Sequence, residues 1–150
     1  MIRRKRTLVI AGIIVVLSLG IVIASIPFLP HPPGTLQQSE THTIPAGSPS
    51  SPNSTAITLS GIPGGVEFQV GVTVTNGTAT FCVLQQTYYL NWNLNDQFSK
   101  GMTPFPYNDC ILQQQTTQAT LSFTPPSTGV WDVVALNMNL NAITVQFSPV

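Results

Sequence analysis

Apolar and polar residues alternate through residues 66–74, and this period of two limits the fold more than any other feature of the sequence. Asn76-Gly77 interrupts the alternation, and β-branched and aromatic residues resume over 78–84. An Asn-Gly pair between two such runs favours a type I′ turn, because both central residues of that turn have positive φ. The segment therefore predicts a β-hairpin, whose apolar first strand contains Val66, Phe68, Val70, Val72 and Val74.

Residues 57–150 contain further short runs of this kind, together with 11 of the 12 aromatic residues. No segment among them has a convincing pattern for a soluble helix. Many short strands without helices predict an all-β fold, an antiparallel β-sandwich, in one small domain. The additional strands are expected at 56–60, 87–94, 119–124, 131–138 and 142–148.

The N-terminal part has the features of a membrane anchor. Four of the five basic residues lie in the stretch Arg3–Arg6, and an uncharged apolar run follows over 8–29. As a helix this run would span about 33 Å, which is enough for a bilayer core of about 30 Å. Because such cationic flanks stay in the cytoplasm, we expect a cytoplasmic stub over 1–7, a single transmembrane helix and an extracellular C-terminal domain. The alternative is a signal peptide that is cleaved before Ser25.

Residues 30–56 differ in composition from the segments on either side, because proline, serine and threonine are frequent there. Proline at this density disfavours both helix and sheet, so we expect an extended stalk between the anchor and the domain. Both histidines, His31 and His42, lie in this segment. We interpret them as solvated linker residues, and the alternative is a metal site or a pH sensor.

Charge is scarce, since 7% of the residues are charged and Lys100 is the only cation beyond residue 29. The absence of arginine from this part argues against binding of nucleic acid or another polyanion. Residues 57–150 contain no histidine, which excludes a Ser-His-Asp hydrolase and a blue-copper site. We expect no enzymatic activity, cofactor or metal, and we interpret the carboxylates as surface or turn residues rather than a glycosidase pair: Glu67, Asp96, Asp109 and Asp132.

Asparagines alternate with apolar residues in two stretches, 90–96 and 137–141. The first stretch loosely matches a calcium loop, but it has one carboxylate and lacks the glycine and the distal glutamate. We therefore interpret both stretches as strands whose asparagines face water. In the first of them the residues that face the core would be Leu90, Trp92 and Leu94.

Cys82 lies in a predicted strand, and Cys110 ends the long connection 95–109. Two cysteines in an exported domain predict a disulfide, whereas a redox pair or two metal thiolates would be the alternative. Two glycosylation sequons begin at Asn53 and Asn76, both at positions that we expect to be exposed.

Several of these runs together carry a resemblance to a known family: 66–74, 80–84, 89–92, 121–131, 135–137 and 143–145. In them the domain resembles the GOLD-like jelly-roll sandwiches of Golgi cargo receptors and of archaeal and bacterial surface proteins. The most specific part is the phenylalanine-proline pattern and Ser-Thr-Gly turn before Trp131. The resemblance implies a jelly-roll sandwich that interacts with proteins or lipids. A cargo-receptor role is not implied, because eukaryotic members have a coiled coil and a C-terminal anchor.

The sequence predicts a membrane-anchored cell-surface protein that acts as a non-catalytic interaction, adhesion or envelope accessory subunit. A first alternative is a secreted filament or pilus-type subunit, a homo-oligomer in which residues 30–60 donate a strand to the next copy. A second alternative is a carbohydrate-binding module. Its platform would lie in the long connection and consist of Phe98, Phe105 and Tyr107.

Overall fold

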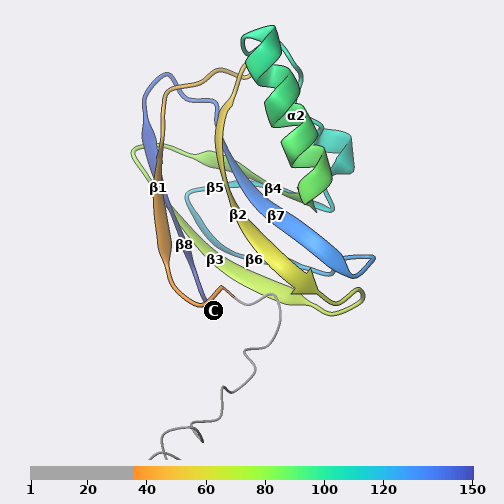
Figure 1. The fold of residues 1–150 in the computed structure, drawn as a ribbon. Helices are drawn as coiled ribbons and strands as arrows, with labels where there is room; N and C mark the ends of the chain where they lie inside the picture. Colours follow the sequence, from red (N-terminus) through yellow and green to blue (C-terminus); the bar gives the residue numbers. More distant parts are fainter. Residues whose placement is uncertain (1–35) are drawn as a thin grey trace, which may run out of the picture. The chain divides into compact units, whose positions relative to one another are not determined.

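The computed structural model describes residues 36–150, in which two antiparallel sheets of four strands pack face to face (Figure 1). The first sheet has the order β1 (Glu40–Ile44), β8 (Ile143–Ser148), β3 (Phe68–Thr75) and β6 (Gln118–Phe123). The second sheet has the order β2 (Asn53–Ile62), β7 (Gly129–Asn137), β4 (Ala79–Gln85) and β5 (Leu112–Thr116). The predicted antiparallel β-sandwich is confirmed.

The chain changes sheet at every connection except the one from β4 to β5, which are neighbours in the second sheet. The helix α2 (Gln86–Ser99) and the short 3-10 helix η1 (Tyr107–Asp109) are inserted into that connection. β1 pairs with β8, β2 with β7, β3 with β6 and β4 with β5, and the pairs β3–β8 and β4–β7 complete the two sheets. The pairing is therefore nested, with the inserted helix at the innermost turn.

The core lies between the sheets and is built from the alternation that the sequence shows. In β3 the side chains of Val70, Val72 and Val74 point inward, and in β8 Val145 and Phe147 do so. Each fully buried aliphatic or aromatic side chain contributes about 1.5–3 kcal/mol relative to an exposed one. Val66 lies outside β3 and is exposed.

The predicted β-hairpin at Asn76-Gly77 is wrong, although the chain does bend at these two residues. Asn76 has φ 68° and Gly77 has φ 152°, so both residues have the positive φ that the dipeptide allows. However, β3 and β4 belong to different sheets, and the turn connects them as an arch across the core. The reason lies in burial, because the six residues of β4 from Ala79 to Leu84 are buried on both faces whereas β3 is buried on one.

The stalk prediction fails over 40–44 and 53–56, which are strands. The described prolines of this segment, Pro45, Pro49 and Pro52, stand between β1 and β2, so they interrupt neither ladder. The sandwich thus begins at β1 rather than at residue 57. β1 pairs with β8 and β2 pairs with β7 of the same chain. These parts of the 30–60 segment therefore already have a strand partner within the molecule.

The predicted strand 87–94 is part of helix α2, and the expectation of a domain without a soluble helix is wrong. Residues that face the sheet recur at helical spacing, with Tyr89, Trp92 and Asp96 partly or fully buried. The helix ends where Lys100 and Gly101 adopt left-handed φ values of 56° and 81°, and the Gly101 N–H donates to the Asp96 carbonyl at 2.9 Å.

The predicted transmembrane helix 8–29 lies outside the described residues, as do the stub 1–7 and His31. Within residues 36–150, no helix combines the length and apolar character needed to cross a membrane.

Candidate contact surface

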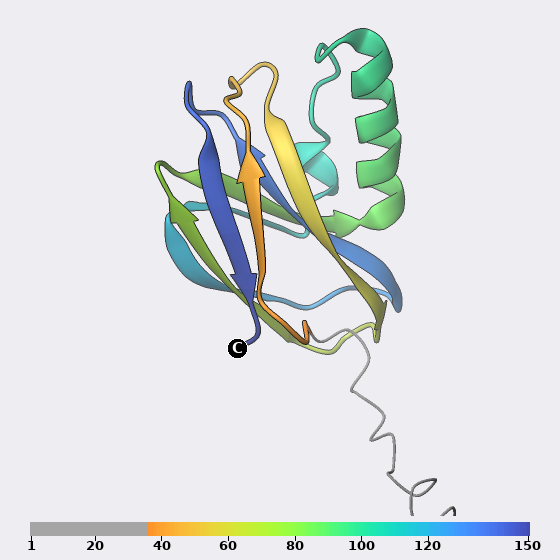
Figure 2. The same ribbon diagram turned by 60° about the vertical axis from the view of Figure 1, so that its left-hand side comes forward.

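Helix α2 lies across the outer face of the second sheet and forms a third layer on that side of the sandwich (Figure 2). A second apolar cluster fills the space beneath it, separate from the core between the sheets. The sheet contributes Cys82, Leu84, Val134 and Leu136, and the inserted segment contributes Trp92 and Phe105. Burial of both faces explains why residues 81–84 of β4 and 133–136 of β7 are uninterrupted apolar runs.

A chain of aromatic contacts fixes the helix and the following segment to each other. Tyr89 stacks on Trp92 with ring centroids 5.9 Å apart, and Trp92 meets Phe105 edge to face at 4.9 Å. Phe105 in turn lies 5.0 Å from the Tyr107 ring. The Trp92 indole N–H donates to the Thr103 carbonyl at 3.0 Å, so the polar atom of this buried ring is satisfied.

Hydrogen bonds hold helix α2 near both of its ends. The Ser54 hydroxyl lies 3.1 Å from the Tyr89 hydroxyl and joins β2 to the helix. Burial raises the Tyr89 pKa above its ordinary value, the Ser54 hydrogen bond lowers it in part, and the Asp132 charge raises it further. At the other end, the Thr103 N–H donates to the Asp96 carboxylate at 3.1 Å.

The disulfide between Cys82 and Cys110 is confirmed, with a Cα–Cα distance of 5.5 Å. Cys82 lies in β4 beneath the helix, and Cys110 directly follows η1. The Ile111 N–H then donates to the Val83 carbonyl at 2.8 Å, so the chain rejoins the sheet immediately after the crosslink. The disulfide therefore closes the whole inserted segment against the sheet.

The three residues of the predicted carbohydrate-binding platform do not form a common surface in the structure. Phe105 is 5% exposed and belongs to the aromatic cluster, whereas Phe98 is 86% exposed on the helix. Tyr107 is half-buried against the cluster, and this burial raises its pKa. The three rings therefore do not share one exposed face, because Phe105 is needed to cover Trp92.

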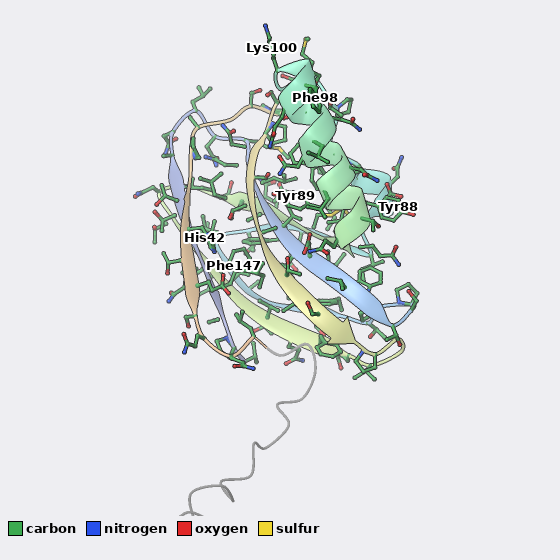
Figure 3. The ribbon with its side chains drawn as sticks, in the orientation of Figure 1. His42, Tyr88, Tyr89, Phe98, Lys100 and Phe147 are labelled. Atoms are coloured by element: carbon green, nitrogen blue, oxygen red, sulfur yellow. A yellow bond between two sulfur atoms is a disulfide. The ribbon has the colours of Figure 1, made fainter. Side chains whose placement is uncertain are left out.

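The outward face of the helix carries a line of exposed apolar side chains. Their exposed fractions are 46% for Leu90, 55% for Leu94, 86% for Phe98 and, just beyond the helix, 76% for Met102. A spacing of four residues places the three helical side chains, Leu90, Leu94 and Phe98, one above the other along one face. We call these four residues the α2 stripe. Figure 3 shows Phe98 near the same end of the helix as Lys100.

The sequence pattern does not predict the α2 stripe, because its alternation places Leu90 and Leu94 on the inside of a strand. In the helix only Trp92 of that trio is buried. The asparagines between them are distributed around a helix, so the calcium-like alternation is lost. The signal that could have revealed the helix is its end, Lys100-Gly101, a typical C-terminal stop.

Asp132 is not a surface residue, contrary to the prediction. It is buried in β7 beside β2, and the Thr58 hydroxyl donates to its carboxylate at 2.7 Å. Burial raises the Asp132 pKa, and the Thr58 hydrogen bond opposes that rise in part. The Gln86 side chain, at the start of α2, lies 3.4 Å from the same Thr58 hydroxyl. A protonatable group therefore lies under the first turn of the helix.

The second asparagine stretch is also structural rather than water-facing. The Asn137 amide is fully buried and donates to the Pro45 carbonyl at 2.7 Å and the Asn141 carbonyl at 2.9 Å. The Asn139 N–H and amide both donate to the Asn137 side-chain oxygen. These bonds join the β1–β2 and β7–β8 connections, while Leu140 is 91% exposed.

The remaining predicted positions fall on the periphery. Asn53 is exposed at the start of β2, where its amide donates to the Ala46 carbonyl, and Asn76 is exposed in the arch. His42 is a strand residue rather than a linker residue. Its ring lies 3.3 Å from the Glu40 carboxylate and contacts Phe147 edge to face at 6.0 Å (Figure 3).

Comparison with known proteins gives only distant structural likenesses. No protein-family model matches the chain, and no curated protein matches it. The crystal structure of PirA is similar with a TM-score of 0.46 and 13% identity, over 81% of this chain and 99% of that one. The IMPa metallopeptidase from Pseudomonas aeruginosa has a TM-score of 0.35 and 11% identity, over 79% of this chain and 13% of that one. Likenesses at this level carry no inference about activity.

Proposed function

We propose that this chain is a membrane-anchored cell-surface protein that acts by non-catalytic contact, with the α2 stripe as its contact surface. The cationic stretch Arg3–Arg6 and the apolar run 8–29 would anchor it, with the sandwich outside the cell. In this role it would be an interaction, adhesion or envelope accessory subunit.

The exposure of the α2 stripe is the observation that carries the proposal. Isolated exposed apolar residues are common, but a row of three along one helix face, followed by Met102 just beyond the helix, forms a patch of the kind that marks an interaction site. The patch is also rigid. Because the aromatic cluster and the disulfide hold α2 to the sheet, binding would cost little ordering of the helix.

The partner that fits this surface is a protein with an apolar groove or a facing helix. Side chains at positions 90, 94 and 98 are the anchors of a helix-in-groove interface. A lipid surface fits less well, because Lys100 is the only cation of the described domain and membrane-surface helices usually carry several. The Phe98 end of α2 also lies opposite the end where the chain enters the sandwich (Figure 3).

The strand order supports a finer description of the fold. We infer a jelly roll, because eight strands form two sheets with the nested pairing of β1 with β8, β2 with β7, β3 with β6 and β4 with β5. This agrees with what the GOLD-like resemblance implies. In that family the sandwich serves interaction with proteins or lipids, which is the role proposed here.

Site-specific photocrosslinking in native membranes tests the contact surface. A crosslinking residue placed at 94 or 98 of the full chain should give a discrete protein adduct, and one placed at 140 should not. Leu140 is the matched control, since it is an exposed leucine in the β7–β8 connection, away from the helix. Equal labelling at all three positions, or adducts with lipid alone, would refute the proposed protein contact.

Of the two sequons, we propose Asn76 as the glycosylated one. It lies in an exposed arch, whereas the Asn53 amide is held by the Ala46 carbonyl. The mass of the protein purified from its host should fall in the Asn76→Gln variant and stay unchanged in Asn53→Gln. An unchanged mass in Asn76→Gln would contradict this assignment.

A further inference from the structure

The sandwich of residues 36–150 has four edge strands, β1 and β6 in the first sheet and β2 and β5 in the second. An edge strand presents unpaired N–H and C=O groups and invites pairing with another chain. Natural proteins usually protect such edges with charges, prolines or bulges. The four edges differ in this protection.

Three of the edges carry such features. β1 contains Glu40 and is followed by Pro45, and β2 stands between Pro52 and Pro63. The register of β2 also shifts between Leu59 and Ile62, which marks a bulge. β6 ends shortly before two consecutive prolines. These features disfavour the addition of a further strand.

The edge strand β5 has none of these features. It pairs with β4 in an unshifted register from Leu112 to Thr116, and its three central residues are exposed glutamines. The chain contains no charged residue from Cys110 to Trp131, so a second copy of this edge would meet no like charge. Each of the two β5 strands in such a contact would have no net charge. This favours a second copy as the partner over a basic or an acidic protein.

We propose that β5 pairs antiparallel with β5 of a second copy, so that two second sheets become one continuous sheet of eight strands. Gln114 is the middle residue of the five-residue strand, so the two-fold axis would pass beside it. Each Gln113 would then lie opposite Gln115 of the other copy. Glutamine amides both donate and accept hydrogen bonds, so they can pair across this axis.

Cysteine crosslinking of the full chain in mild detergent tests this pairing. Directly opposed residues of an antiparallel pair have Cβ atoms about 4.5–5.5 Å apart, close enough for oxidation to a disulfide after small adjustment. Gln114→Cys should therefore give a covalent dimer under mild oxidation. Both native cysteines are already paired, so they leave no competing thiol in the described domain.

Gln146→Cys is the matched control, because Gln146 is an exposed strand residue in the first sheet, away from the β5 edge. It should give at least tenfold less covalent dimer than Gln114→Cys. Equal crosslinking of the two variants would overturn the proposed interface.

A charge-swap experiment supplies a second, independent measurement. Gln114→Glu or Gln114→Lys alone would bring like charges together at the axis, and each variant should sediment as a monomer. An equal mixture of the two should recover the dimer, because the axis then joins opposite charges. Dimers of unchanged strength in either single variant, or a wild-type chain that is monomeric at millimolar concentration, would refute the proposal.

Discussion

Removal of the Cys82–Cys110 disulfide tests whether the inserted segment 86–111 depends on its covalent closure. The crosslink joins residues 28 positions apart, and the loop that it closes contains the end of β4, helix α2 and η1. On the chain-entropy model a loop of this length stabilises the folded state by about 3.6 kcal/mol, because the crosslink restricts the unfolded chain. This is a large share of the 5–15 kcal/mol that is typical of a domain.

The assay is thermal and urea unfolding of a fragment comprising residues 36–150, in the oxidised form and in the Cys82→Ala/Cys110→Ala double variant. For a domain of this size 1 kcal/mol corresponds to roughly 4 °C, so we expect Tm to fall by about 14 °C. The urea m value should rise, because the uncrosslinked unfolded chain exposes more surface.

The control is addition of reductant, which should lower Tm of the oxidised form and leave the double variant unchanged. A fall of less than about 4 °C with an unchanged m value would refute the reasoning. It would mean that the aromatic cluster alone closes the segment. If the sandwich stayed folded in the double variant while the helical signal was lost, the reasoning would also be refuted, because helix α2 would then unfold independently of the two sheets.

Four further substitutions test the site and its supports. Phe105→Ala should cost about 3–5 kcal/mol by emptying the aromatic cluster, whereas Phe98→Ala should change stability by less than about 0.5 kcal/mol; similar losses would contradict the different burial of the two rings. Asn137→Ala should cost at least about 2 kcal/mol, because it leaves the buried Ile44 carbonyl and the partly buried Pro45 and Asn141 carbonyls without this donor, and a neutral result in urea unfolding would contradict that role. Burial raises the pKa of Asp132, so protonation of this carboxyl favours the folded state below its ordinary pKa, and that stabilisation is lost as pH rises through the raised value. The Asp132→Asn variant should therefore have a higher Tm than wild type at pH 7 but not at pH 3. An equal difference in Tm at both pH values would contradict this.

The two-sheet architecture could be predicted because its signals are local. The alternation in β3, β6 and β8 and the apolar run of β7 each reveal a strand without knowledge of its partner. The disulfide was equally accessible, since two cysteines in such a domain have one pairing. The arrangement of strands between sheets was not accessible, because an Asn-Gly turn serves a hairpin and an arch equally well.

Helix α2 was missed because Leu90, Trp92 and Leu94 fit a period of two by coincidence. A signal outside the helix was present. Residues 81–84 and 133–136 are uninterrupted apolar runs, which in an antiparallel sheet indicate strands covered on both faces. Such runs require a third layer over the second sheet, and among the connections within residues 36–150 only the one between β4 and β5 is long enough to supply it. The exposed stripe then follows from the helical phase of the buried residues.

The two proposed surfaces have a joint consequence, because both belong to the second sheet. A two-fold axis between antiparallel edge strands is perpendicular to the sheet, so pairing through β5 would place both α2 helices on the same side. Fourteen residues give a helix about 21 Å long, whose outward face alone is smaller than the roughly 800 Å² per partner of a standard interface. A single stripe should therefore bind weakly. Two stripes on one face could engage a partner with paired sites about 10²–10⁴ times more tightly without any new contact. Gln114→Glu, far from the stripe residues in sequence, should then weaken capture of that partner on membranes while leaving the affinity of one isolated domain unchanged.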